Sequence, residues 1–568
     1  MNSSSNSQPT GATGSNACAI AVDSHKQRTG GFLQIWVMGG AAMLCAAAVV
    51  GLFLLLMVGS RDYFWIQPVV AFSVQEYGDE PPEKIVGQIR SRQLLSPIQL
   101  EAMGESFGQD QPVARISIKV GNKEHNGLDF MQILSPHIVS ELETPPDVLL
   151  IERHSWGNFY GWLEQVGPLA SGDSKGGEQR ASGDQAYAEL QRLFPKVQQL
   201  VAEADDVQQG PLAELSWQLE QNRHRQAVLR KRRAEGAGAI GTTGTDPAPP
   251  TPAQAELSAQ YQQLSQRYML EEERLQQLRV QARSWTATLV SGQDRRAEIN
   301  LADIVRFYRP NDLSVWSLTS LFFIKIGEFL STEPREANTE GGVFPAIFGT
   351  ICLVLLMTIL VAPFGVLSAF YLHEYRRQGA VVRLIRVCIN NLAGVPSIVF
   401  GIFGLGFFVY GLGGSIDELF FADHLPNPTL GTPGLFWAAL TLSLLTLPVV
   451  VVATEEGLAR IPSSMRQGAL ALGATRFEML SKVVFPMAVP GILTGLILAI
   501  ARAAGEVAPL MLVGAVKFAP DLPVDGHFPF VHLDQKFMHL GFHIYDAGFQ
   551  SPNSEAALPL VYASSLLL

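Results

Sequence analysis

The 568-residue sequence has few charged residues and few cysteines, and each shortage excludes a class of protein. Charged side chains make up only 16% of the residues, whereas 47% are hydrophobic, and the formal net charge is −11. A net acidic chain argues against a nucleic-acid binder, which would present basic surface. No cysteine falls in the long polar segment, so that segment has no disulfide framework and no cysteine-based metal site. The four cysteines are Cys18, Cys45, Cys352 and Cys388.

Enzyme motifs are also lacking. Neither the phosphate loop G-x-x-x-x-G-K-[ST] nor the zinc motif H-E-x-x-H occurs. The letters G-x-G-x-x-G occur at Gly236–Gly241, but a charged run precedes them instead of a strand, so no dinucleotide site is predicted. One late segment gathers four histidines, which we interpret as part of a solvated loop: His527, His532, His539 and His543. The sequence therefore predicts no enzyme, no metal site and no cofactor in this chain.

Long apolar runs are what the sequence has in abundance. A bilayer is spanned by about 20 apolar residues, and five runs reach that length: Trp36–Gly59, Val343–Leu372, Val387–Leu412, Gly434–Ala453 and Val489–Val516. The first run is too long for the apolar core of a secretion signal, so we interpret it as an uncleaved anchor. A sixth run begins near Ala556 and is interpreted as a truncated last helix. The fold class predicted is a polytopic, all-α membrane protein with about six transmembrane helices.

The positions of Lys and Arg beside these runs predict the orientation of the chain. The loop after the second run carries Arg376, Arg377, Arg383 and Arg386, and the loop after the fourth carries Arg460, Arg466, Arg476 and Lys482. The loop after the third is acidic. This alternation predicts a multi-pass membrane protein with a cytoplasmic N-terminus. Residues 1–31 would be a disordered cytoplasmic tail, residues 32–60 the first transmembrane helix, and residues 61–340 periplasmic.

The segment 61–340 is predicted to be an α+β domain. The stretches ARISIKV, DVLLIERH and AEINLADIVRFY have the patterns of strands. Between them, apolar residues recur at spacings of three and four, which predicts an antiparallel coiled-coil hairpin over about residues 185–290. The glycine- and proline-rich stretch EGAGAIGTTGTDPAPPTP would be its flexible tip. Val315–Leu330 is predicted to lie along the membrane surface, anchored by Trp316.

A glycine-broken segment follows the fourth apolar run, within residues 454–488. In MRQGALALGATRFEMLSKVVFPMAVPGI, Gly473 is expected to take a positive φ after a helix at Met465–Leu472. A second helix, Thr475–Val484, is expected to end at Pro486. The segment resembles the coupling loop of ABC importer permeases, whose pattern is E-A-A, three residues, G, nine residues, I-x-L-P. Those places hold Gln467, Gly468, Ala469, Gly473, Val483, Phe485 and Pro486. The alternative is an ordinary amphipathic loop lying on the membrane.

Two further stretches, NNLAGVPSIVFG and ARAAGEVAPL, resemble the phosphate permeases of that family. The resemblance implies a permease domain at residues 341–568 that translocates inorganic phosphate. It also implies a sister permease, a dimeric ATPase that binds ATP and Mg, and a periplasmic phosphate-binding protein. Two alternatives stay open. The first is a permease for another oxyanion such as sulfate or molybdate, and the second is an envelope signalling or scaffold protein that uses the periplasmic domain.

Charged and polar residues inside the apolar runs are the candidate site residues. Arg502 and Glu506 are four apart in the fifth run, so they are expected on one helix face near its middle. Charge at that depth is costly, which favours a phosphate pathway, with Ser397 as a further donor. A purely structural ion pair is the alternative. Asn390 and Asn391 are expected to begin a helix interrupted by Pro396, which would act as a hinge or gate, or else as a simple packing kink.

Overall fold

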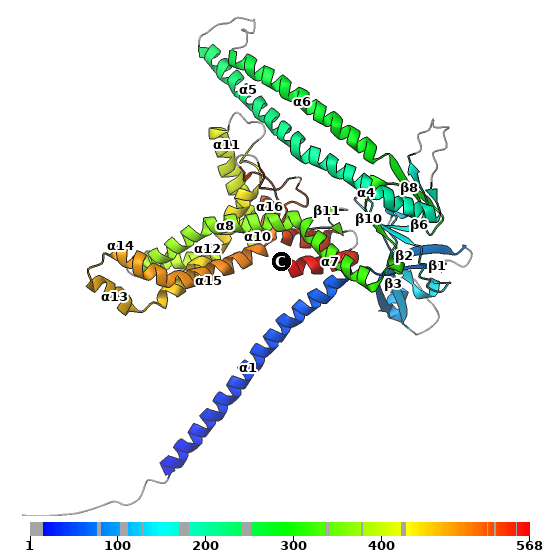
Figure 1. The fold of residues 1–568 in the computed structure, drawn as a ribbon. Coiled ribbons are helices and arrows are strands. Elements are labelled where there is room, and N and C mark those ends of the chain that lie inside the picture. The colour runs from blue at the N-terminus through cyan, green and yellow to red at the C-terminus, as the bar shows by residue number, and fades with distance from the viewer. Residues whose placement is uncertain are drawn as a thin grey trace, which may run out of the picture.

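The computed structural model describes residues 15–568, and it leaves out several internal segments. These are residues 76–80, 103–111, 128, 170–180, 240–251, 336–337, 339, 376–378, 422–427, 520, 527–529 and 552–553. Figure 1 shows a bundle of long helices, a β-rich part at one end of it, and a helical hairpin that extends from the β-rich part.

Five helices among the described residues are long and apolar enough to cross a membrane, as the sequence predicts. They are α1 (Ser15–Phe64), α8 (Phe344–Phe370), α10 (Ser397–Phe403) continued to α11 (Gly414–Phe420), α12 (Leu435–Ala459) and α15 (Phe485–Ala504). Three wide π-helical segments extend these helices: Tyr371–Tyr375 after α8, Gly404–Gly413 between α10 and α11, and Leu480–Val484 before α15.

Two predicted spans have wrong bounds, and a proline explains each. The third span begins at Ser397 instead of Val387, because Pro396 disfavours helix in the residue before it. The preceding residues form a separate helix, α9 (Ala380–Leu392). The fifth span ends at Ala504, and α16 (Ala508–Val513) follows as a separate helix. The ring of Pro509 would clash with the carbonyl four residues earlier, at Gly505, so one continuous helix cannot form there.

The two ends of the chain differ from the predicted domain bounds. Helix α1 begins at Ser15, so residues 15–31 are helical where disorder was predicted; the stretch ACAIAV supplies good helix formers. Residues 1–14 lie outside the described residues. Helix α18 (Ser554–Leu567) packs along the end of α1, where the Tyr562 ring covers Gly59. Its apolar part, Ala557–Leu567, is shorter than a span, so a sixth membrane helix stays a prediction.

The core of the bundle is α12, which lies between α8 and α15. Two-thirds of its most apolar stretch is buried, whereas none of the most apolar stretch of α1 is buried. Glycines bring the neighbouring backbones close to it: a side chain added at Gly365 of α8 would meet Val450 at 2.6 Å, and one added at Gly495 of α15 would meet Ala453 at 2.7 Å. Small residues that permit such approach are the usual means of packing helices in membranes.

Two antiparallel sheets form the α+β domain. The first has the order β1-β2-β3-β4, with β1 at Val69–Val74, β2 at Glu83–Leu95, β3 at Val113–Lys119 and β4 at Phe130–Leu134. The second has the order β10-β5-β6-β8-β9, with β5 at Leu149–Arg153, β6 at Phe159–Pro168, β8 at Trp285–Val290, β9 at Arg296–Asn300 and β10 at Ile304–Tyr308; β7 (Ala181–Ser182) pairs with β6. The three predicted strand stretches are confirmed, the last of them divided into β9 and β10 by a 3-10 turn at Leu301–Asp303.

The predicted hairpin is confirmed as an antiparallel helix pair. Helix α4 (Asp184–Val207) packs on the second sheet and continues through a π-helical turn, Gln208–Leu212, into α5 (Ala213–Ala239). The chain returns as α6 (Pro252–Ala282), so the hairpin ends before residue 290 because β8 begins at Trp285. The α5–α6 contact is partly polar, with Arg223 donating to the Tyr261 hydroxyl at 2.9 Å. Coiled-coil packing stays a prediction, and the tip at 240–251 lies outside the described residues.

The α+β domain leads into the bundle through α7 (Val315–Ser331), the predicted surface helix, whose Trp316 is fully exposed. Strands β11 (Pro334–Arg335) and β12 (Glu340–Gly341) then precede α8. The remaining elements are short: α2 (Pro97–Ala102), α3 (Lys123–Asn126), α13 (Ser463–Ala471), α14 (Arg476–Met479), α17 (Leu540–Tyr545), the 3-10 turns Ser135–His137 and Pro310–Asp312, and the π-helical turn Asp546–Gln550.

Candidate functional site: a helix–turn–helix knob and a charged helix end

The segment between α12 and α15 folds into two short helices at one end of the bundle (Figure 1). Helix α13 ends just before Gly473, whose φ is +88°, so the predicted left-handed glycine is confirmed. Thr475 then caps α14: its hydroxyl accepts from the backbone N–H of Glu478, and the Glu478 carboxylate accepts from the N–H of Thr475. This reciprocal capping fixes the turn. We name residues 461–484 the knob.

The second helix of the knob does not end at Pro486, contrary to the prediction. It runs from α14 through the π-helical segment Leu480–Val484 into α15, and Pro486 stands in the first turn of α15. A proline interrupts a helix because it lacks an N–H and crowds the carbonyl four residues before it. The wider π turn at that point changes the hydrogen-bond spacing and so accommodates the ring.

The knob has a buried base and an exposed apolar tip. Its base is an apolar cluster that includes Leu458, Ile461, Met479, Leu480, Val484, Ala488 and Ile492. At the tip, Leu472 is 91% exposed and Phe477 is 70% exposed. Gln467 and Gly468 are exposed on α13, and a side chain at Gly468 would meet nothing within 4 Å. Large apolar side chains presented on a rigid projection are typical of a surface that binds another protein.

Sequence reasoning missed the residue that holds the knob in place. Arg466 was counted only as a positive charge beside the membrane. In the structure its guanidinium donates to the carbonyls of Leu458 and Ile461, both at 2.8 Å, and pairs with Glu374 at 2.8 Å. A second pair, Arg386 with Glu455 at 3.1 Å, joins α9 to the end of α12. The sequence signal that could have suggested a partner for Arg466 was Glu374, an acidic residue just after the second apolar run.

Arg502 and Glu506 form the predicted ion pair, with Nε to Oε1 at 3.4 Å, but the expected placement is wrong. Arg502 lies in the last turn of α15 and Glu506 follows the end of that helix, so they do not share one helix face in mid-span. The break before Pro509 causes this difference. The Arg502 side chain is 41% exposed and the Glu506 side chain 18%, so the guanidinium is open to a ligand while its partner is mostly covered.

The other predicted site residues lie around the break between α9 and α10. Asn390 and Asn391 are exposed in the last turn of α9, so they end a helix instead of beginning one, because the residues before Pro396 cannot continue it. Ser397 begins α10, which packs against α16 through Gly401 and Pro509. None of the hydrogen bonds of the described residues joins Ser397 to Arg502 or Glu506. The hinge and the phosphate pathway stay predictions.

Two of the four histidines differ from the predicted solvated loop. His539 is fully buried at the start of α17 and His543 is 3% exposed within it, because the segment 537–543 packs against α8. His532 pairs with Asp525 at 2.9 Å, and His527 lies outside the described residues. Within the described part of the chain, no group of three or more His, Cys, Asp or Glu is placed to hold a metal ion. The first part of Gly236–Gly241 is the end of α5, and the rest is not described.

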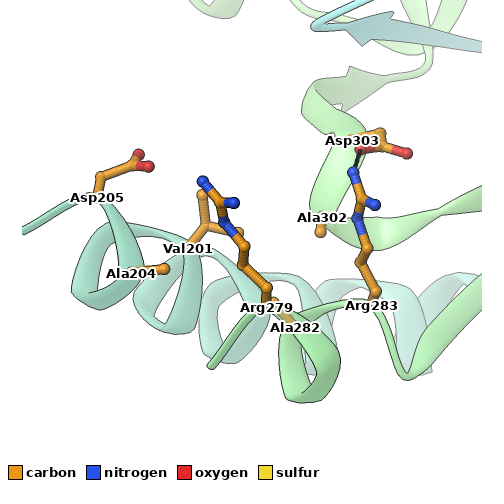
Figure 2. Close-up of a pocket in the computed structure, with 8 residues that line it drawn as sticks. All are labelled: Val201, Ala204, Asp205, Arg279, Ala282, Arg283, Ala302 and Asp303. Atoms are coloured by element: carbon orange, nitrogen blue, oxygen red, sulfur yellow. Dashed lines mark ion pairs between the residues drawn. The ribbon is translucent and has the colours of Figure 1, made fainter. Parts of the chain in front are cut away.

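A pocket of about 330 Å³ lies in the α+β domain between α4, α6 and the turn before β10. Figure 2 shows Arg279 and Arg283 between two carboxylates, with Asp205 on the side of Arg279 and Asp303 next to Arg283. Arg283 pairs with Asp303 at 3.8 Å, and Arg279 donates to Gln208 at 2.5 Å. The lining is balanced in charge and its arginines already have partners. Sequence reasoning did not predict this pocket.

Comparison with known proteins finds a family that is similar to part of the bundle. Residues 361–519 match the family described as the binding-protein-dependent transport system inner membrane component. The phosphate transport system permease protein PstA of Mycobacterium leprae is 38% identical over 175 residues, which is 31% of this chain and 52% of that protein. PstA of Yersinia pestis is 35% identical over 184 residues, or 32% of this chain and 56% of that protein. The chain thus spans about half the length of these relatives.

Among solved structures, the inward-facing MetNI methionine ABC transporter matches 40% of this chain and 93% of its own chain, with 17% identity and a TM-score of 0.27. The matching family and the PstA relatives are transport components, in agreement with the prediction that this chain is not an enzyme. The residues of the family match, 361–519, lie outside the α+β domain. Residues 361–519 of this chain are therefore similar to the inner membrane component of binding-protein-dependent transport systems, and the chain is similar to PstA over about half of the length of PstA.

Proposed function

We propose that this chain is the membrane-spanning permease subunit of an ATP-driven importer that moves inorganic phosphate across the bacterial inner membrane. The knob is the observation that carries the proposal. It combines a left-handed Gly473, a capped second helix and an exposed apolar tip, and it has the spacing of the family's coupling loop. A rigid projection of this kind can receive movement from a separate ATPase and pass it to α12 and α15, between which it is built.

The proposed orientation places the knob in the cytoplasm and the α+β domain in the periplasm. Figure 1 has the knob and the two sheets at opposite ends of the bundle, so they would lie on opposite sides of a membrane. The knob carries Arg466, Arg476 and Lys482, and Arg460 directly precedes it, which favours the cytoplasmic side. The N-terminus would also be cytoplasmic.

The proposed phosphate contact is Arg502. Its guanidinium offers donors in a planar fork that matches the oxygens of phosphate, and it is partly exposed at the break between α15 and α16. Glu506 holds the guanidinium from one side and would weaken the binding of an anion, so that phosphate is released after passage. Ser397 would add a hydroxyl donor from α10, which packs on the same α16.

The proposed partners follow from the relatives and from the exposed surfaces. A PstB-type ATPase dimer, which supplies ATP and Mg, would bind the tip with Leu472 and Phe477. A PstC-type sister permease would cover part of the exposed apolar face of the bundle, and membrane lipid would cover the rest. A periplasmic PstS-type protein would deliver phosphate to the end of the bundle that faces away from the knob.

Uptake of labelled phosphate tests the proposal. Cells lacking their own phosphate permease would receive this chain together with its partner subunits, at low external phosphate. We expect uptake that excess sulfate and molybdate do not inhibit. We also expect Arg502→Gln to raise the phosphate concentration needed for half-maximal uptake, whereas Lys482→Gln, an exposed change on the knob, leaves it unchanged.

Each contrary result has a definite meaning. Uptake that sulfate or molybdate suppresses would assign a different oxyanion to the permease. Absence of any anion uptake from a chain that is present in the membrane with its partners would refute the transport proposal. A chain in which residues 65–310 are deleted separates transport from signalling, because a signalling protein would lose its response while phosphate uptake continued.

A further inference from the structure

Arg466 occupies a junction where three parts of the bundle meet. It stands on α13, its two carbonyl acceptors belong to the end of α12 and the turn after it, and its carboxylate partner, Glu374, belongs to the π-helical end of α8. The Arg466 side chain is 19% exposed and the Glu374 side chain is 11% exposed. One mostly buried guanidinium therefore uses three of its donor directions to join the knob to two different spans.

The chain path alone attaches the knob to α12 and α15 but not to α8. Phe370 of α8 makes an apolar contact with the cluster at the base of the knob. The centroid of its ring lies 6.0 Å from the ring centroid of Phe485. Apolar contacts have no preferred direction, so they allow sliding, whereas a charge-assisted hydrogen bond between buried groups has a defined geometry. The pair between Arg466 and Glu374 is therefore the contact that fixes α8 to the knob in one position.

The pair between Arg386 and Glu455 provides a comparison at the same end of the bundle. It joins α9 to α12 with a single distance of 3.1 Å, and the Arg386 side chain is 39% exposed. Water and dissolved ions reach such a pair and weaken it. Arg466, by contrast, is enclosed and has three acceptors, so its loss leaves a buried carboxylate and two carbonyls without their donor.

We infer that Arg466 is a positioning residue that makes the knob and the end of α8 move as one body, so that movement of the knob is passed to α8 as well as to α12 and α15. The inference rests on the proposed function, in which a partner ATPase moves the knob. Helix α8 lies along α12 with Gly365 against Val450, so displacement of α8 relative to α12 would change the packing at the centre of the permease.

The first test compares ATP use with transport in the assembled complex in lipid vesicles. Glu374→Ala should leave the ATPase rate near that of the wild type, whereas the phosphate moved per ATP falls by roughly tenfold, within the range typical of coupling between sites. Glu374→Gln keeps an acceptor, so the phosphate moved per ATP should fall less than in Glu374→Ala. Arg466→Lys should lower this ratio by an intermediate amount, because one ammonium group cannot reach all three acceptors. Arg296→Ala, which removes an exposed pair with Glu164 outside the knob, is the control.

The second test measures position and does not depend on which anion is carried. In a chain whose four cysteines are replaced, spin labels are placed at Leu472 on the tip and at Leu367 on α8, both exposed. In the assembled complex we expect one narrow distance distribution, with or without nucleotide. Glu374→Ala should add a second, nucleotide-dependent distance, while Arg296→Ala should not.

The outcomes separate this inference from the proposed function. If Glu374→Ala retains the wild-type distance distribution and the wild-type ratio of phosphate to ATP, Arg466 has no positioning role. If the distances change as expected but the complex carries another anion, the inference holds and only the assignment of phosphate falls. If the Glu374→Ala variant does not reach the membrane, Glu374→Gln replaces it, because glutamine preserves the shape of the side chain. The same spin-label distances are then measured in that variant.

Discussion

The α+β domain and the helical bundle bury polar groups in different ways. Buried charges in the α+β domain are paired: Lys119 with Glu340 and Asp129, Glu152 with Lys325, and Arg153 with Glu124. In α12, by contrast, the buried polar side chains include Thr441 and Thr446, whose hydroxyls donate to carbonyls of their own helix. The difference teaches that the domain depends on charge pairs that must remain complete, whereas the packing around α12 depends on close approach of helix backbones.

The two regions meet at the residues just before α8. Lys119 of β3 pairs with Glu340 of β12, and the Tyr63 hydroxyl at the end of α1 donates to the carbonyl of the next residue, Gly341, at 2.8 Å. Burial alone would lower the pKa of Lys119, but the carboxylates of Glu340 and Asp129 outweigh it and raise that pKa above its ordinary value. The charged amine is therefore the stable form at this junction.

Removing that amine should give the largest effect. Lys119→Ala leaves Glu340 and Asp129 without their cation, and breaking a buried pair costs about 3–5 kcal/mol. We expect faster hydrogen exchange in β3, β4 and β12, measured on the purified chain, with little change in α12. Arg296→Ala, which breaks the exposed pair with Glu164, should change exchange little, since such pairs contribute about 1 kcal/mol or less.

Removing all three charges of this junction together separates the effect of the lysine charge from the effect of the lysine shape. Lys119→Met with Glu340→Gln and Asp129→Asn leaves no unpaired charge, so stability should return toward that of the wild type. Continued rapid exchange in the triple variant would mean that the shape of the lysine, and not its charge, holds the junction.

Acid should weaken the α+β domain before it weakens the bundle. Burial alone would raise the pKa of Glu152, but Lys325 and the Tyr308 hydroxyl outweigh this and lower it from 4.5 to about 2. A group with a lowered folded-state pKa stabilises the fold above pH 4.5, and this contribution of roughly 3 kcal/mol is lost as the pH falls toward 2. Hydrogen exchange between pH 6 and pH 3 should show β5 and α7 losing protection first. Glu152→Gln should remove most of that pH dependence, and an unchanged pH profile would contradict the role of Glu152.

The sequence predicted well what depends on local chemistry. Apolar length gave the five spans, alternation gave strands such as β3, and glycine chemistry gave the positive φ of Gly473. It failed where two local rules competed. Pro509 ended the span that apolar length extended to Val516, which moved Arg502 from mid-span to a helix end.

Contacts between distant segments could not be read from the sequence at all. Arg466 and Glu374 are separated by 92 residues and Lys119 and Glu340 by 221, and no periodicity marks either pair. The packing of the segment 537–543 against α8, which buries His539, likewise depends on a tertiary contact, where composition suggested a solvated loop.

Overpacking a glycine should disturb the bundle and leave the sheets intact. Gly365→Val places atoms where Val450 already lies, 2.6 Å from the added Cβ, so α8 must move away from α12. Such overpacking costs about 1–3 kcal/mol. The thermal transition of the detergent-solubilised chain should fall, while hydrogen exchange in β3 stays unchanged. Gly40→Val on α1, where nothing lies within 4 Å, is the control. An equal loss in both variants would show that helix propensity, and not packing against α12, decides the result.

The turn at the tip of the knob depends on neither charge burial nor close packing, so it should respond to a third kind of change. A side chain at Gly473 would meet nothing within 4 Å, yet φ of +88° is strained for any β-branched residue by about 1–2 kcal/mol. Gly473→Val should therefore distort the tip and weaken binding of the ATPase while the thermal transition of the bundle hardly moves. Gly468→Val is the matched control, because its backbone is helical and its surroundings are equally open. If both variants bind the ATPase equally well in a pull-down with purified subunits, the shape of the turn is not what the partner recognises.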